Sequence, residues 1–255
     1  MILALDIGNT NTKVALFEGR EVLKYWRIST DRNRSSDEMG LQITSLMQLF
    51  GLSSACVEGI IMSSVVPQIN FTVEHMCRNY FGMEPMRIRA GMNTGIQILY
   101  ENPEELGSDR IANGAAAYEL YGGPCITVDF GTATSFGVIS GRGEFMGGAI
   151  CPGLKLSAEA LTERAAKLPR FELVKPGQVI GRNTVTNMQS GIVYGYIGQV
   201  RYLIERMKRE MNSPKAKVIA TGGLAVLVEE ESGVFDVMDG LLTLKGLRLI
   251  YEKNR

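Results

Sequence analysis

Two short stretches of the sequence combine an aspartate, a glycine and small polar side chains in the same order. They are Asp6-Ile7-Gly8-Asn9-Thr10-Asn11-Thr12 and Asp129-Phe130-Gly131-Thr132-Ala133-Thr134-Ser135. A strand that ends in Asp-x-Gly and turns through such residues exposes backbone N–H groups and hydroxyls, which suit phosphate oxygens. The carboxylate can hold a cation that accompanies the phosphates. Each stretch alone is typical of an ordinary hairpin turn, but two copies in one chain favour phosphate binding.

Lys13 directly follows the first stretch. An ammonium at this position could reach a phosphoryl oxygen as a compact point charge. When the two stretches are aligned without gaps, Phe136 takes the place of Lys13, so we expect the two copies to have specialised. The alternative is that Lys13 is an exposed strand residue without a role in binding.

The segment Gly107-Ser108-Asp109-Arg110 places an acid beside a guanidinium at the start of a predicted alanine-rich helix. Ser108 or Asp109 would serve well as an N-cap, which is the plainer interpretation of the segment. In the functional interpretation, Asp109 takes the proton of an attacking hydroxyl and Arg110 binds an anionic group of the substrate.

Two glycine-rich segments join predicted strands to predicted helices, residues 147–153 and 221–223. Their small side chains let a ligand approach the backbone closely, although each is equally well explained as a plain connection. The sequence has no G-x-x-x-x-G-K-[ST], and its glycines miss the G-x-G-x-x-G spacing. P-loop and Rossmann folds are therefore not indicated.

The surrounding elements repeat. The first part predicts strands over 2–7, 12–17 and 21–29, then a helix, a strand and two helices over 36–50, 59–66, 70–81 and 109–121. After Gly122-Gly123-Pro124 come strands over 125–130, 134–140 and 144–150, then helices over 154–167 and 188–211, a strand over 215–220 and a helix over 241–251. The repeat predicts an α/β protein of two similar domains, residues 1–121 and 122–255.

The bulk composition excludes several classes of protein. With 27 basic and 27 acidic residues the chain is neutral, so nothing indicates nucleic acid as a partner. No apolar stretch approaches the roughly 18 residues of a membrane helix, and no signal peptide is evident, so a cytosolic location is expected. Four scattered cysteines and the single His75 make a zinc site improbable and favour reduced thiols.

The helix predicted over 188–211 carries Gly191, Gly195 and Gly198, spaced four and three residues apart. Each glycine lowers helix stability by about 1 kcal/mol relative to alanine, so a compensating interaction is expected. Close helix packing would compensate, either within the chain or across a dimer interface.

Together and in this order, the motifs resemble those of the type III pantothenate kinases, relatives of sugar and acetate kinases, Hsp70 and actin. The resemblance extends over nearly the whole chain and is carried by residues 6–13, 107–110 with Asn113, 129–134, 147–153, 221–223 and 242–247. It implies two similar actin-like (ribonuclease H-like) domains with mixed sheets and an interdomain cleft. Ser135 stands where the family often has threonine, and the hydroxyl is kept.

The resemblance implies ATP-dependent phosphorylation of pantothenate to 4′-phosphopantothenate, the first step of coenzyme A biosynthesis, by a cytoplasmic homodimer. Asp109 is implied as the proton acceptor. Asp129 is implied to bind a monovalent cation, potassium or ammonium, beside ATP with Mg²⁺. The implied ATP-binding residues are Asp6, Ile7, Gly8, Asn9, Thr10, Asn11, Thr12, Lys13 and Thr132. The implied pantothenate-binding residues are Tyr100, Gly107, Ser108, Asp109, Arg110 and Thr184.

Three alternatives stay open at this point. The chain could be a non-catalytic regulator on the same fold, since a fold alone does not define a function. It could also be a kinase for another small hydroxylated acid, or a phosphatase of the same superfamily. The presence of Lys13, Asp109 and Arg110 together argues against the regulator, which would be free to lose them.

Overall fold

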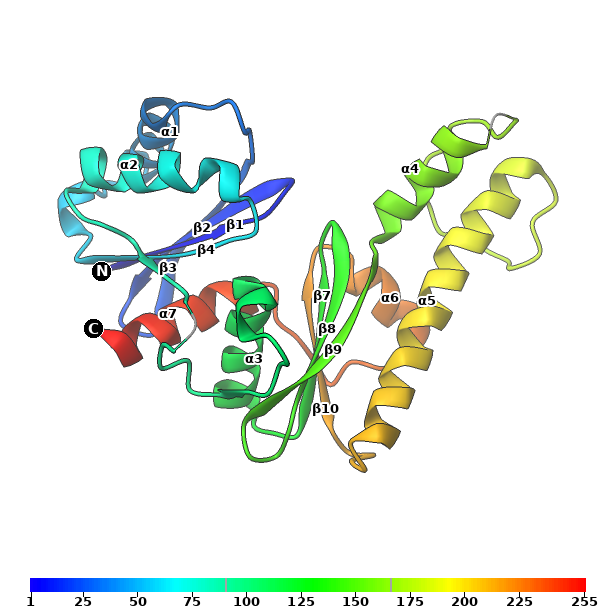
Figure 1. The fold of residues 1–255 in the computed structure, drawn as a ribbon. Helices are drawn as coiled ribbons and strands as arrows, with labels where there is room; N and C mark the ends of the chain where they lie inside the picture. The colour runs from blue at the N-terminus through cyan, green and yellow to red at the C-terminus, as the bar shows by residue number, and fades with distance from the viewer. Residues whose placement is uncertain (90, 166) are drawn as a thin grey trace. The chain divides into compact units, whose positions relative to one another are not determined.

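The computed structural model describes residues 1–255 except 90 and 166, and its chain forms two compact units (Figure 1). Unit 1 consists of residues 1–119 and 241–255, and unit 2 of residues 120–240. Each unit is built on a mixed sheet, so the α/β expectation is confirmed. The units differ from the expected division into 1–121 and 122–255, because the last 15 residues belong with the N-terminal unit.

The sheet of unit 1 has the strand order β3-β2-β1-β4-β5. Its central strand β1 pairs antiparallel with β2 and parallel with β4. All six residues of β1 are buried, as in a strand that is covered on both faces of the sheet. The strands are β1 (Ile2–Ile7), β2 (Asn11–Glu18), β3 (Glu21–Ser29), β4 (Gly59–Ser64) and β5 (Met86–Arg87).

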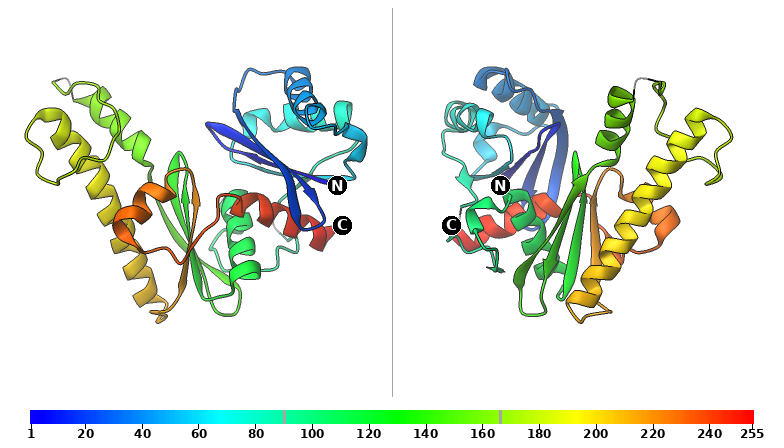
Figure 2. Two further views of the ribbon diagram at one scale, coloured as in Figure 1. Left: turned by 180° about the vertical axis from the view of Figure 1, so that it is seen from behind. Right: turned by 45° about the vertical axis from the view of Figure 1, so that its right-hand side comes forward.

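Helices cover both faces of this sheet, as Figures 1 and 2 show. Helices α1 (Ser36–Gln48) and α2 (Asn70–Phe81) pack on one face and enclose an apolar core with β1, β2 and β4. A capping box between Ser35 and Glu38 starts α1. The other helices of this part of the chain are α3 (Ser108–Tyr121) and α7 (Leu242–Asn254).

Helix α7 explains why residues 241–255 belong with unit 1. It contacts β1, β2 and β4, and its Lys253 forms an ion pair of 3.3 Å with Glu119 of α3. Its apolar residues Leu242, Leu244, Leu247 and Ile250 are completely buried. An amphipathic helix must bury its apolar face, but the pattern does not say against which sheet.

The strands of unit 2 have the order β11-β10-β7-β8-β9. They are β7 (Cys125–Phe130), β8 (Ala133–Ile139), β9 (Glu144–Pro152), β10 (Lys217–Gly222) and β11 (Val237–Met238). Helices α4 (Leu154–Arg164), α5 (Thr184–Glu210) and α6 (Ala225–Ser232) contribute to one apolar core with β7, β8 and β10. The meander of β1, β2 and β3 thus returns as β7, β8 and β9.

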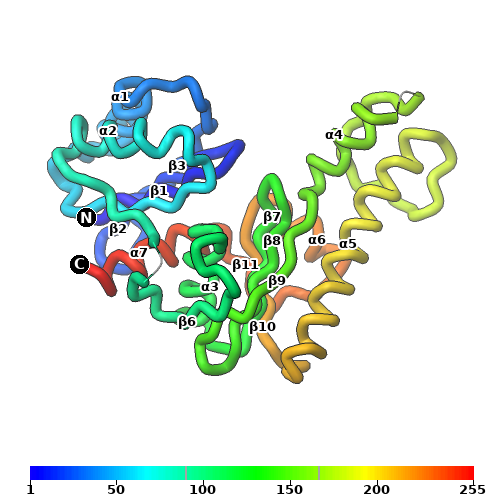
Figure 3. Tube along the Cα trace, viewed as in Figure 1, coloured from blue at the N-terminus to red at the C-terminus, as the bar shows by residue number. Residues whose placement is uncertain are grey.

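Several short elements were not expected from the sequence. These are the two-residue strands β5, β6 (Gln97–Ile98) and β11, helix α6, and 3₁₀ helices at Ser54–Cys56, Pro67–Ile69 and Pro103–Glu105. Figure 3 labels β6, β11 and α6 along the chain trace. Helix α5 begins at Thr184, four residues before the expected start, because Asn183 caps it. Helix α4 ends at Arg164, and position 166 of its expected range lies outside the described residues.

Among the described residues, none of the helices has the length and apolar character needed to cross a bilayer. Over the same part of the chain, no group of three or more His, Cys, Asp or Glu side chains is arranged to hold a metal.

Candidate active site

The first polar hairpin joins β1 to β2 in unit 1. Asp6 and Lys13 face each other across the two strands, and their side chains form an ion pair with Nζ and Oδ2 3.2 Å apart. The turn closes through a hydrogen bond of 3.1 Å from the N–H of Gly8 to the carbonyl of Asn11. Asn9 and Thr10 are exposed at its tip, whereas Ile7 is buried in the core. The side chain of Lys13 is only 22% exposed, unlike that of a plain surface residue.

The segment that starts α3 is anchored to this same sheet. The hydroxyl of Ser108 lies 2.8 Å from that of Ser63 and accepts a hydrogen bond of 3.2 Å from the N–H of Ser64. Ser63 is the register partner of Asp6 in the neighbouring parallel strand, so both side chains point to one face of the sheet. The start of α3 therefore lies beside the aspartate of the first hairpin.

Ser63 is a site residue that the sequence analysis missed. It is buried, and it joins Ser108, 45 residues away in the chain, to the strand that carries Asp6. The only local signal for a site here is a pair of serines at the end of a predicted β-branched strand. Neither a glycine nor a charged residue adjoins this pair.

Asp109 is the second residue of α3 and is partly buried. Its Oδ1 accepts a hydrogen bond of 2.9 Å from the N–H of Arg110, which holds the carboxylate at the positive end of the helix. Neither Ser108 nor Asp109 is the N-cap that the plainer interpretation expected, because α3 already begins at Ser108, but the carboxylate of Asp109 still accepts from one N–H group of the first turn. The contact also fixes the direction of the carboxylate, which a proton acceptor needs.

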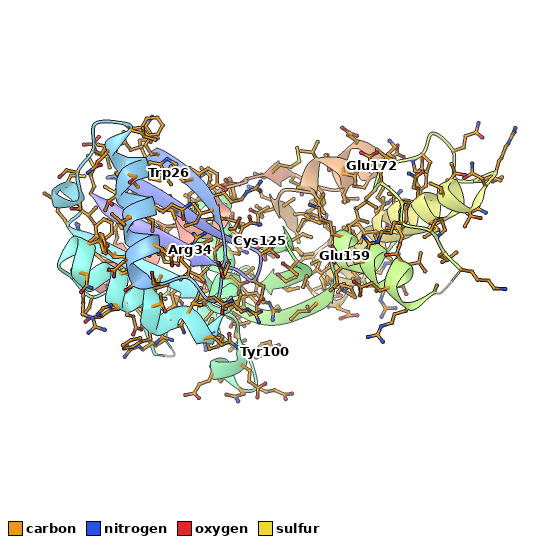
Figure 4. The ribbon with its side chains drawn as sticks, turned by 90° about the horizontal axis from the view of Figure 1, so that it is seen from above. Trp26, Arg34, Tyr100, Cys125, Glu159 and Glu172 are labelled. Atoms are coloured by element: carbon orange, nitrogen blue, oxygen red, sulfur yellow. The ribbon has the colours of Figure 1, made fainter. Side chains whose placement is uncertain are left out.

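Arg110 and Tyr100 lie together although they are separated by ten residues. The guanidinium carbon of Arg110 is 5.8 Å from the centre of the Tyr100 ring, within range of a cation–π interaction. Arg110 is buried, whereas Tyr100, which is labelled in Figure 4, is partly exposed. Two of the expected substrate-binding residues are therefore neighbours in unit 1.

The second hairpin, between β7 and β8, has a different register from the first. Asp129 pairs with Ser135, whereas the gapless alignment expected Phe136 at this position. A hydrogen bond from the N–H of Gly131 to the carbonyl of Ala133 closes the turn, so its loop is one residue shorter than that of the first hairpin. A shift of one residue reverses the face of every side chain, and Phe136 is consequently buried in the core. The residue across from Asp129 is a serine, not an apolar side chain.

Two glycines allow other segments of unit 2 to approach this hairpin. The N–H of Gly153, at the start of α4, donates to the carbonyl of Thr132 over 3.1 Å, and a Cβ at Gly153 would lie 2.4 Å from that carbonyl oxygen. Gly222, with φ of 92°, lies beside Phe130, whose carbonyl oxygen would be 2.5 Å from an added Cβ. Only glycine fits at either position.

Tyr196 of α5 closes the buried side of the second hairpin. Its hydroxyl is hydrogen-bonded to that of Thr134. Burial raises the pKa of Tyr196 to about 12, and the negative charge of Asp129 acts in the same direction. The phenol is therefore neutral at physiological pH and is a hydrogen-bonding group, not an anion.

Thr184 does not lie beside the second hairpin. It is the exposed first residue of α5, at a hollow of about 370 Å³ that is lined by residues of α4 and α5 and by Leu168. Tyr196, which contacts the hairpin, is twelve residues further along the helix, about 18 Å at 1.5 Å per residue. Unit 2 thus keeps Thr184 apart from Asp129 and Thr132.

The expected site residues form one group in unit 1 and another in unit 2, and Thr184 lies apart from the second group. Unit 1 brings together residues 6–13, residues 107–110 and Tyr100 around the ends of β1 and β4. Unit 2 holds Asp129 and Thr132 on one turn. These oxygen-rich groups suit hard cations and phosphates, because carboxylate, hydroxyl and carbonyl oxygens are their usual ligands.

The fold is shared with solved structures of low sequence identity. A protein described as a Baf family transcriptional activator from Campylobacter jejuni matches with a TM-score of 0.61 and 19% identity, over 98% of this chain and 97% of its own. An activator of 2-hydroxyisocaproyl-CoA dehydratase from Clostridium difficile, with bound ADPNP, matches at 0.53 and 12% over 99% and 95%. A protein described as an N-acetylmannosamine kinase from Listeria monocytogenes matches at 0.55 and 13% over 98% of both chains. These matches confirm the actin-like fold.

The sequence also matches a family model. The model is that of the type III pantothenate kinases, and it covers residues 2–206, which include all of the predicted catalytic, ATP-binding, pantothenate-binding and cation-binding residues.

Proposed function

The chain belongs to the type III pantothenate kinase family, and we propose that its phosphoryl transfer relies on Asp109 as the proton acceptor. Membership means that the chain phosphorylates pantothenate with ATP to form 4′-phosphopantothenate, the first step of coenzyme A biosynthesis. The observation that supports the role of Asp109 is the serine bridge, in which Ser63 joins the start of α3 to the strand pair that carries Asp6 and Lys13. The start of the helix that carries Asp109 and the turn of the first hairpin are thereby attached to the same sheet.

In the proposed reaction, the 4′-oxygen of pantothenate forms a bond to the γ-phosphorus of ATP. The bond from that phosphorus to the β,γ-bridging oxygen breaks, and ADP leaves. The hydroxyl proton passes to the carboxylate of Asp109. Phosphoryl transfer requires mainly positioning and charge neutralisation, so an ionised carboxylate near the hydroxyl suffices as the acceptor.

The ATP phosphates are assigned to residues 6–13 and to Thr132. The turn of the first hairpin offers backbone N–H groups and short polar side chains, and Lys13 offers a positive charge. Asp6 is the carboxylate that would hold Mg²⁺ on the phosphates. The neighbour with bound ADPNP supports nucleotide binding by this fold.

Pantothenate is assigned to Tyr100, residues 107–110 and Thr184. Arg110 suits the carboxylate of pantothenate, because a guanidinium can bind both carboxylate oxygens at once. Its contact with the Tyr100 ring restricts the directions in which the guanidinium can point. Thr184 would supply a hydroxyl from the start of α5.

Asp129 is assigned to a monovalent cation, potassium or ammonium. It is partly exposed near the end of β7 and pairs with Ser135 across the second hairpin. A carboxylate beside a hydroxyl offers oxygen ligands, which suit a hard cation. The cation would supply positive charge near the phosphates, and no protein group in the second turn replaces Lys13 in this respect.

The decisive experiment incubates the purified chain with ATP, Mg²⁺, potassium and pantothenate and follows 4′-phosphopantothenate by mass spectrometry. We expect one ADP per product and no product from 4′-deoxypantothenate, which lacks the attacking hydroxyl. Replacing potassium by sodium should slow the reaction. Phosphate release without product would favour the phosphatase, transfer to other hydroxy acids alone would favour a different kinase, and no reaction at all would favour the regulator.

We further propose that the enzyme is a cytoplasmic homodimer that associates through α5. Gly191, Gly195, Gly198 and Tyr202 form an exposed stripe along this helix. Apart from the adjoining residues and the backbone of α5 itself, a Cβ at any of the three glycines would meet no atom of the described residues within 4 Å. The expectation of close packing within the chain is therefore wrong for these residues, and a second copy is the occupant that we propose.

Gly195→Leu should convert the dimer to a monomer in sedimentation experiments, because the larger side chain separates the two helices. It should not destabilise the monomer, since the position is open and glycine costs a helix about 1 kcal/mol relative to alanine. Gly195→Ala is the matched control, and we expect it to remain dimeric. Unchanged sedimentation of the leucine variant would contradict an interface through α5.

A further inference from the structure

The segment that follows β3 lies against the first hairpin. The N–H of Thr30 donates to the carbonyl of Thr10 over 3.0 Å, and the hydroxyls of Thr12 and Thr30 are 2.9 Å apart. Two residues after Thr30, Nη2 of Arg32 donates to Oδ1 of Asn9 over 3.2 Å. Three contacts therefore attach this segment to the turn that we assign to the ATP phosphates, and they bring an arginine to its rim.

The contact between Arg32 and Asn9 determines how the asparagine amide is turned. A guanidinium has five N–H donors and no acceptor, so only the oxygen of an amide can face it. With Oδ1 directed to Arg32, the amide nitrogen of Asn9 lies on the opposite side of its planar group. The tip of the hairpin then offers N–H donors to an incoming anion, and the repulsive oxygen is kept away.

Charge adds to this effect. The ammonium of Lys13 is 3.2 Å from the carboxylate of Asp6, which offsets its positive charge before a nucleotide binds. Arg32 is exposed, and its guanidinium adds a second positive charge at the exposed tip of the turn. Guanidinium groups match phosphate oxygens through paired N–H donors, which makes arginine well suited to this place.

The neighbouring arginine has a different role. Arg34, labelled in Figure 4, directs Nη1 to Oε1 of Gln42 in α1, so it ties the segment to the helix. Between the two arginines, the N–H of Asn33 donates to Oδ1 of Asp31 over 2.9 Å and stabilises the local turn. Arg34 thus anchors the segment to α1, whereas Arg32 contacts the hairpin.

We propose that Arg32 is a nucleotide-binding residue of this enzyme, which contacts the ATP phosphates by its charge and orients the amide of Asn9 toward them. The proposal rests on the assignment of the first hairpin to ATP. It extends the phosphate site from the hairpin itself to the segment after β3, and it predicts that this segment discriminates nucleotides by their number of phosphates.

The test compares Arg32→Ala with Arg20→Ala, which removes another exposed arginine at the opposite end of β2 and β3. We expect Arg32→Ala to raise the KM for ATP by about tenfold, the effect of one or two charge-assisted hydrogen bonds. The KM for pantothenate and the thermal unfolding midpoint should stay unchanged. Arg32→Lys should fall between the wild type and Arg32→Ala, because it keeps the charge but loses the paired donors.

Calorimetry with a nonhydrolysable ATP analogue and with adenosine gives a readout that does not depend on pantothenate. Arg32→Ala should weaken the analogue about tenfold and leave adenosine unaffected. Adding Asn9→Ala to Arg32→Ala should cost less than Asn9→Ala costs in the wild type, because the two residues act together. Equal affinity of Arg32→Ala and Arg20→Ala for the analogue would overturn the proposal, even if pantothenate proved not to be the acceptor.

Discussion

Replacing Asp109 by asparagine is expected to lower kcat for pantothenate phosphorylation by about 10²-fold or more, the range of general acid–base catalysis. The amide of asparagine cannot accept the proton that the 4′-hydroxyl must lose. In a loose transition state that proton leaves late, so the loss should appear in kcat and not in the binding of ATP.

The asparagine variant is informative because it changes the charge of the side chain but hardly its shape. Its amide oxygen can still accept the hydrogen bond from the N–H of Arg110, so the start of α3 should remain intact. We expect a normal unfolding midpoint and nearly normal affinity for an ATP analogue. Steady-state kinetics with saturating ATP and potassium, together with calorimetry, measure both quantities.

Asp37→Asn is the matched control for this experiment. Asp37 also lies in the first turn of a helix of unit 1, where it accepts a hydrogen bond from the hydroxyl of Tyr80, and its substitution should leave kcat unchanged. Wild-type turnover by the Asp109 variant would leave helix capping as the only role of that carboxylate. A fall in kcat with both variants would point to a general effect on the fold.

Replacing Lys13 by methionine is expected to lower kcat/KM for ATP by roughly 10²- to 10³-fold, as for the loss of one preorganised electrostatic group. The ammonium lies across the turn from the aspartate that would hold Mg²⁺, so it can neutralise charge on the transferred phosphoryl group. Lys13→Arg keeps the charge but changes its reach, and its activity should be intermediate.

The methionine variant should also be less stable. Asp6 is 7% exposed, and without Lys13 its carboxylate loses its ion-pair partner. A penalty of about 1–3 kcal/mol in the free energy of unfolding is expected from such a loss. Urea unfolding measures this penalty. Kinetic assays at low denaturant and moderate temperature, where the variant is folded, measure the loss of activity separately from the loss of stability.

Lys24→Met controls for the loss of a lysine from this sheet, since Lys24 is in β3 and lies 4.0 Å from the ring centre of Phe50. It should not alter the kinetics with ATP. If Lys13→Met behaved like this control, Lys13 would be a strand residue without a role in phosphate binding.

Much of the site could be predicted because its signals are local. The sequence Asp-x-Gly followed by small polar residues specifies a strand and a tight turn within eight residues, and both copies form a strand and a turn. The same holds for the capping box of α1 and for the alanine-rich helix α3. In each case the interacting groups are neighbours in the chain, so the order of residues contains the information.

The unequal registers of the two hairpins could not be predicted in this way. A gapless alignment treats Lys13 and Phe136 as equivalents, but β8 pairs one residue out of step and places Ser135 opposite Asp129. The reason is that register follows which side chains can be buried. Phe136 fills the core of unit 2, and the turn shortens to permit it.

The duplicated α/β architecture, the two polar turns and the acid at the start of α3 follow from the order of residues, because each is specified by residues close together in the chain. Three other features arise from packing between distant segments: α7 completes unit 1, Ser63 joins α3 to the strand of Asp6, and Arg32 contacts Asn9. These contacts join residues 23 or more positions apart. Their existence depends on how β-strands pair and how helices pack, which no short segment of sequence specifies.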